Sequence, residues 1–88
     1  MRTIWKYELD IKDTLVINMP NGAKVLHVGT QQGEPCIWVE VDTEAEQVPY
    51  TFHIYGTGHP IKENKYNKPM YLGTFKIKND SLIFHLYY

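Results

Sequence analysis

The sequence has little of what marks several large protein classes. Its 88 residues include one cysteine, so no disulfide can form within the chain. No apolar run approaches the roughly 20 residues that span a bilayer, and the first residues lack the apolar core of a signal peptide. A formal net charge of −1 is not the basic excess of a typical nucleic-acid binder. We therefore expect one domain, residues 1–88, with no membrane partner and no direct nucleic-acid binding.

Groups for catalysis are also scarce. Ser81 is the only serine and follows Asp80 in an expected tight turn, outside any nucleophile motif. Cys36 lies within an expected strand, where most cysteines are small buried hydrophobic residues. No spacing suggests paired carboxylates in a cleft. The sequence therefore predicts a non-enzymatic protein with no catalytic residues and no cofactor.

What the sequence does have is alternation of apolar and polar residues with a period of two. Asn21-Gly22 marks a turn, because both residues tolerate positive φ. The expected strands are 3–9, 15–19, 24–28, 36–42, 48–55, 70–78 and 82–88. This pattern predicts an all-β fold, a small antiparallel β-sandwich or barrel of about seven short strands with little or no helix. Neighbouring strands are expected to pair as a meander.

The alternation also predicts which residues face the core. Ile37, Val39 and Val41 share one face of their strand. Tyr71 and Phe75 share a face in the sixth strand, and we expect both to point inward. Residues 43–47 are expected to form a loop.

Three histidines lie in the middle of expected strands, on the less apolar faces. We expect His53 and His85 to share a face with Trp38 and Glu40. If His27 joined them, three imidazoles could hold zinc and leave a fourth position open. No recognised ligand spacing is present, so the histidines are read instead as strand residues with an apolar body and a polar tip in contact with solvent. We predict no metal site.

The irregular stretch 56–69 is the most distinctive part of the chain. Gly56, Thr57 and Gly58 would let backbone amides approach an anion closely. His59, Lys62 and two further lysines follow and make the loop locally positive. The spacing matches neither a Walker loop nor a dinucleotide fingerprint. The alternative is a solvated loop whose glycines serve a turn.

Two broader features remain. Residues 34–46 carry five acids and no lysine or arginine, which describes either an ordinary acidic surface or a partner-binding strip. Twelve aromatic residues are more than a small core can bury, so some are expected on an interaction surface. Their abundance also follows from β-propensity alone.

Six segments spread over nearly the whole chain form a recognisable set: 3–9 (TIWKYEL), 19–28 (MPNGAKVLHV), 35–38 (PCIW), 55–60 (YGTGHP), 71–75 (YLGTF) and 84–86 (FHL). The set resembles a family of short proteins from phages and prophages whose function is not established. The resemblance implies a phage protein acting in the host cytoplasm, and proteins of that kind often counteract host defence. It assigns no role to any residue.

The leading hypothesis is capture of a small phosphorylated ligand, such as a nucleotide signal, between the protomers of a homo-oligomer. Phosphate contacts would come from Gly56, Thr57, Gly58 and Lys62, and the base would be stacked or oriented by Tyr55, His59 and Trp38. The first alternative is an inhibitor that blocks a host protein with its aromatic or acidic surface. The second is a small structural or virion-associated protein.

Overall fold

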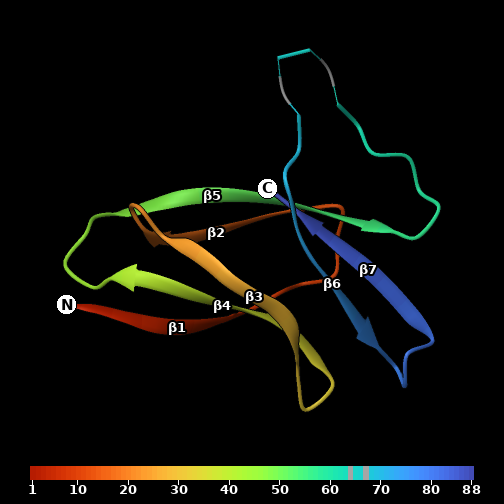
Figure 1. The fold of residues 1–88 in the computed structure, drawn as a ribbon, viewed down its shortest axis with the longest axis horizontal. Coiled ribbons are helices and arrows are strands. Elements are labelled where there is room, and N and C mark those ends of the chain that lie inside the picture. The colour runs from red at the N-terminus through yellow and green to blue at the C-terminus, as the bar shows by residue number, and fades with distance from the viewer. Residues whose placement is uncertain (64, 67) are drawn as a thin grey trace.

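Alternating apolar and polar residues form seven strands and no helix in residues 1–63, 65–66 and 68–88, the part that the computed structural model describes (Figure 1). The strands are β1 (Arg2–Glu8), β2 (Thr14–Pro20), β3 (Lys24–Gln31), β4 (Glu34–Asp42), β5 (Gln47–Gly56), β6 (Tyr71–Ile77) and β7 (Leu82–Tyr87). The all-β prediction and the seven expected strands are confirmed. In these described residues no helix is long and apolar enough to cross a membrane.

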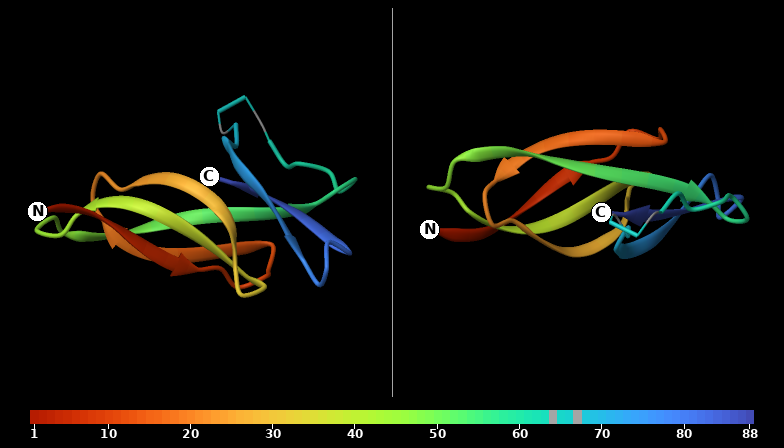
Figure 2. Two further views of the ribbon diagram at one scale, coloured as in Figure 1. Left: turned by 60° about the horizontal axis from the view of Figure 1, so that its bottom comes forward. Right: turned by 90° about the horizontal axis from the view of Figure 1, so that it is seen from above.

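The strands form two antiparallel sheets, and the architecture is a small sandwich, not a closed barrel (Figure 2). Sheet A has the order β1-β4-β3, and sheet B has the order β2-β5-β7-β6. Among the described strands, only the β3–β4 and β6–β7 hairpins pair neighbours in sequence, so the predicted meander is wrong. The chain instead changes sheet between β1 and β2, between β2 and β3, and between β4 and β5.

β5 pairs with a different strand along each of its two edges. Its first part pairs with β2, from Gln47 to His53, and its last part pairs with β7, from His53 to Gly56. β5 therefore joins β2 to the β6–β7 hairpin, and its residues 54–56 extend beyond the first residue of β2.

The core lies between the sheets. Ile37, Val39 and Val41 of β4 have no exposed surface, as the alternation predicts. They pack in one cluster with apolar residues of sheet B, among them Phe52 and Phe75. Complete burial of one such side chain stabilises a fold by about 1.5–3 kcal/mol, so these alternating positions hold the two sheets together.

One predicted orientation is wrong. Tyr71 was expected to face the core but is 54% exposed, whereas Phe75 in the same strand is 2% exposed. The register against β7 shifts between Tyr71 and Gly73, so Leu72 is an extra residue in β6. Such a bulge reverses the facing of the residues on one side of it, and alternation alone does not reveal it.

Candidate functional site

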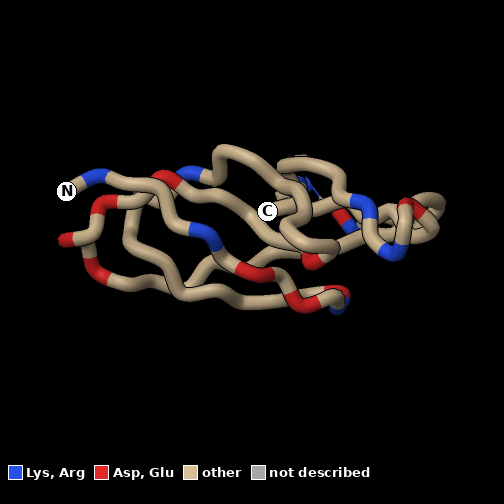
Figure 3. Tube along the Cα trace, turned by 90° about the horizontal axis from the view of Figure 1, so that it is seen from below, with Lys and Arg blue, Asp and Glu red and all other residues tan. Residues whose placement is uncertain are grey.

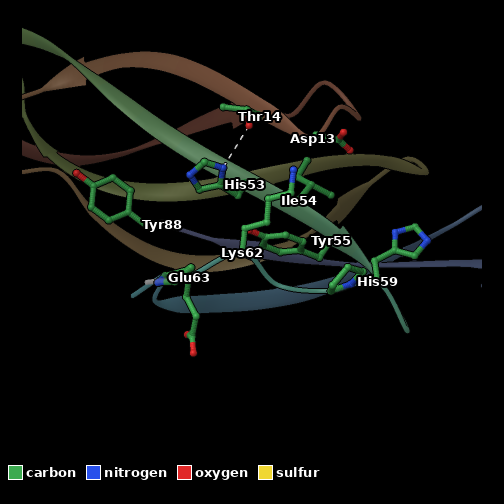
Figure 4. Close-up of a pocket in the computed structure, with 11 residues that line it drawn as sticks. Asp13, Thr14, His53, Ile54, Tyr55, His59, Lys62, Glu63 and Tyr88 are labelled. Carbon is green, nitrogen blue, oxygen red and sulfur yellow. Dashed lines mark hydrogen bonds between the residues drawn. The ribbon is translucent and has the colours of Figure 1, made fainter. Parts of the chain in front are cut away.

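A cavity of about 540 Å³ lies between the end of β5 and the segment that follows it (Figure 4). Its lining comes from the start of β2, from β5, from the segment after β5 and from the end of the chain. The lining residues are Asp13, Thr14, His53, Ile54, Tyr55, His59, Pro60, Lys62, Glu63, Pro69 and Tyr88. Three predicted ligand-binding residues, Tyr55, His59 and Lys62, are therefore brought together.

The turn after β5 places His59 at the cavity wall. The His59 amide donates a hydrogen bond to the Gly56 carbonyl at 3.1 Å, and Gly58 has a φ of +90°. A Cβ on Gly56 would lie 2.9 Å from Cε1 of the His59 ring. Gly56 thus lets the imidazole pack on the backbone, and Gly58 supplies the left-handed conformation of the turn.

The side chain of Thr57 contacts a histidine of β7. Its Oγ1 lies 2.8 Å from Nε2 of His85, and Thr74 Oγ1 lies 2.9 Å from Nδ1 of the same ring. Tyr71 Oη is 2.6 Å from Thr74 Oγ1. A neutral imidazole donates through one nitrogen and accepts through the other, so two threonines hold the ring in place. Neither Thr57 nor Gly58 lines the cavity.

His53 is a cavity residue that the ligand-binding prediction left out. Its Nδ1 is 3.2 Å from Thr14 Oγ1, which fixes the ring against the start of β2 (Figure 4). Thr14 and His53 are register partners, and Tyr87 lies opposite His53 on the other side. The alternation identified His53 as an outward strand residue but could not show that β2 lies beside it.

Trp38 lies apart from the cavity. It belongs to sheet A, where its ring packs against His27 with a centroid distance of 5.6 Å. The expectation that Trp38 and Glu40 share a face with His53 and His85 is therefore wrong, because the two pairs belong to different sheets. In the described residues no three His, Cys, Asp or Glu side chains are grouped to hold a metal ion.

The cavity walls carry charges of both signs. Lys62 is exposed, and the acidic residues Asp13 and Glu63 belong to the same lining. The wider acidic stretch lies elsewhere, and Figure 3 shows acidic positions gathered at the end of the molecule near the N-terminus. There Glu40 is paired with Arg2 at 2.8 Å. The acidic stretch and the cavity are thus separate surfaces.

Cys36 and Ser81, the two nucleophiles considered from the sequence, each occupy a structural position in the fold. Cys36 is 1% exposed, and its burial raises the pKa of the thiol, so the reactive thiolate is disfavoured. Ser81 donates its hydroxyl hydrogen to the Lys78 carbonyl within the β6–β7 turn. Neither side chain lines the cavity. The cavity lining includes the aromatic residues Tyr55 and Tyr88, two histidines and one lysine.

No curated protein and no solved structure matches the chain. A family model, DUF7352, described as a domain of unknown function, matches residues 1–88.

Proposed function

Since the chain belongs to the DUF7352 family, a domain of unknown function, we propose a function from the cavity: it binds a small phosphorylated aromatic molecule, such as a nucleotide. The observation that carries the proposal is the meeting of Tyr55, His59, Lys62 and His53 around one space. The volume of about 540 Å³ falls within the 300–1,000 Å³ typical of small-molecule sites.

Each lining group has a role that its chemistry suits. The Tyr55 ring offers a face for stacking a base. Lys62 and the His59 imidazole supply charged or polar donors for phosphate oxygens. The carboxylates of Asp13 and Glu63 oppose a highly charged anion, and they suit the hydroxyl groups of a ribose or the amino groups of a base. The carboxylates thus favour one phosphate over several, and the ribose and base contacts favour a nucleotide over free inorganic phosphate.

The proposed activity is capture without chemical change. If the chain acts as the phage proteins that it resembles, the captured molecule is a nucleotide signal of the host, and binding sequesters it in the host cytoplasm. Trp38 has no part in a cavity that one chain forms by itself, because it lies in the other sheet.

The test is titration of the ¹⁵N-labelled protein with adenosine and guanosine 5′-monophosphates and with inorganic phosphate, followed by NMR. We expect a nucleotide to shift the amides of Tyr55, His59 and Lys62. The double variant His59→Ala/Lys62→Ala should weaken binding at least tenfold, because it removes two of the phosphate donors. Lys76→Ala is the matched control, because Lys76 is an exposed β6 lysine that does not line the cavity.

Native mass spectrometry of the protein purified from bacterial cells extends the test to ligands outside this panel. A co-purifying mass that the double variant loses would support the proposal. Equal nucleotide affinity in the wild type and the double variant would overturn it, as would a set of shifted amides remote from the cavity.

A second candidate rests on the acidic end of the molecule. Asp42, Glu44 and Glu46 surround the β4–β5 turn, and Glu44 and Glu46 are exposed. We infer that this end could occupy a basic groove of a host protein. Charge reversal at all three positions should then weaken capture of a host protein and reduce its salt dependence, whereas unchanged capture would count against this candidate.

A further inference from the structure

β1 is an edge strand without the bulge, the terminal proline or the packed edge neighbour that marks the other three edges of the described sheets. β3 and β6 each carry a bulge and pack against each other, with Val28 of β3 against Gly73 of β6. β2 ends at Pro20, which has no amide hydrogen to donate. β1 pairs regularly with β4 over seven residues, with no bulge, proline or glycine. No described strand lies on its other side (Figure 1).

The hydrogen bonds at the two ends of β1 show which backbone groups face its free edge. The Leu9 amide donates to the Pro35 carbonyl at 3.0 Å, and the Thr43 amide donates to the Met1 carbonyl at 2.8 Å. In the antiparallel register, odd residues of β1 therefore bond to β4. The amides and carbonyls of Arg2, Ile4, Lys6 and Glu8 point to the free edge.

Each face of the sheet carries an exposed apolar side chain beside this edge, and on the outer face it lies among the charged residues Arg2, Lys6 and Glu8. Ile4 is 55% exposed on the outer face. Trp5 is 38% exposed although it shares the inner face with its register partner Val39, which is fully buried. A long, regular edge strand with exposed apolar residues on both faces is a template for another strand.

We propose that a second copy of this chain pairs with β1 antiparallel, about a twofold axis at Trp5. Each Arg2 then lies opposite the partner's Glu8, and each Ile4 lies opposite the partner's Lys6. These pairs are the ones whose backbone groups face the free edge. Opposite charges at directly paired positions stabilise a sheet.

Two neighbouring registers also place the even residues of β1 opposite each other, and like charges disfavour both of them. A shift by two residues in one direction places Arg2 opposite the partner's Lys6. A shift in the other direction places Lys6 opposite the partner's Lys6. Like charges at directly opposed positions destabilise the pairing, so the residues of β1 select one register.

In that register four residue pairs exchange backbone hydrogen bonds, about eight bonds in all. The two three-stranded A sheets become one continuous sheet, and each Trp5 ring is covered by the partner's Trp5. The cavity residues come from the start of β2 and the residue before it, from β5, from the segment after β5 and from the end of the chain, and none lies in β1, so β1 pairing leaves both cavities free.

Sedimentation velocity of the whole protein over about a hundredfold range of concentration tests the proposal. We expect a species of twice the 10.3 kDa monomer mass at the high end. Ile4→Pro should give a monomer, because it removes an amide that faces the free edge and leaves the bonds to β4 in place. Val16→Thr, on the outer face of β2, is the control and should still dimerise.

Glu8→Lys provides a second variant if Ile4→Pro fails to fold by circular dichroism. It should weaken the dimer about tenfold, since each of two opposed pairs changes from attractive to repulsive. Trp5→Cys tests the register: oxidation should link two chains at the axis, whereas Thr3→Cys should not link them. A wild type that stays monomeric overturns the proposal, as does a dimer that persists in folded Ile4→Pro or Glu8→Lys.

Discussion

Val28 of β3 leaves no room for a side chain at Gly73 of β6. A Cβ built there would lie 2.6 Å from Val28 Cβ, closer than non-bonded carbons approach. We expect Gly73→Ala to lower the free energy of unfolding by about 1–3 kcal/mol, the usual cost of overpacking. Urea denaturation measures this loss. Gly29→Ala is the control, because its new Cβ would lie 3.0 Å from Nε2 of the exposed His27 ring, which can move. Equal losses would contradict the argument.

Asp42 links stability to pH at the β4–β5 turn. The Glu44 amide donates to Asp42 Oδ1 at 3.0 Å and holds the pKa of that carboxyl below its usual range. A folded pKa below the unfolded one gives stability that is present above the unfolded value and is lost as pH falls through the folded value. Asp42→Asn should therefore lose less stability between neutral and acidic pH than the wild type does.

Urea denaturation at several pH values between about 7 and 3 measures this difference. Asp10→Asn, on the β1–β2 connection, is the comparison variant. A wild-type pH dependence that Asp42→Asn leaves unchanged would show that another carboxyl is responsible.

At the scale of elements, the sequence predicted strands better than their pairing. Period-two alternation and turn residues are local, and all seven strands follow from them. The partners of a strand depend on residues far along the chain: β1 pairs with β4, and β2 pairs with β5. Nothing within either segment encodes that choice, because both would be satisfied by any amphipathic neighbour. The bulge at Leu72 could not be predicted for a similar reason, because it is defined by the pairing of β6 with β7.

The β6–β7 turn contains three successive residues in the left-handed region. Lys78, Asn79 and Asp80 have φ values of 53°, 56° and 66°. Asparagine and aspartate tolerate this conformation, whereas it costs lysine roughly 1 kcal/mol. Lys78→Gly should therefore raise the free energy of unfolding by about 0.5–1 kcal/mol. Lys76→Gly, within β6, should lower it by a similar amount because glycine weakens a strand. Thermal unfolding of the two variants gives the comparison, and a destabilised Lys78→Gly would contradict it.

At the scale of the whole molecule, the candidate site was partly predictable. Tyr55, His59 and Lys62 are near each other in sequence, so their meeting follows from one strand and one turn. Thr14 and Tyr88 line the same cavity but come from the start of β2 and the end of the chain. Trp38 was assigned to the site because it lies on the face of its strand that carries both apolar and polar residues. The alternation along a strand does not show which sheet the strand joins.

The division of β5 between β2 and β7 has a consequence for the order of folding. Of the strand pairs in the described part of the chain, only β3–β4 and β6–β7 join neighbours in sequence and can form as local hairpins within microseconds. β5 must then close long loops to meet β2 on one side and β7 on the other. Such non-local pairing slows folding to milliseconds or seconds. The strand at the centre of sheet B is therefore among the last to acquire both of its neighbours, and the cavity beside it forms only when it does.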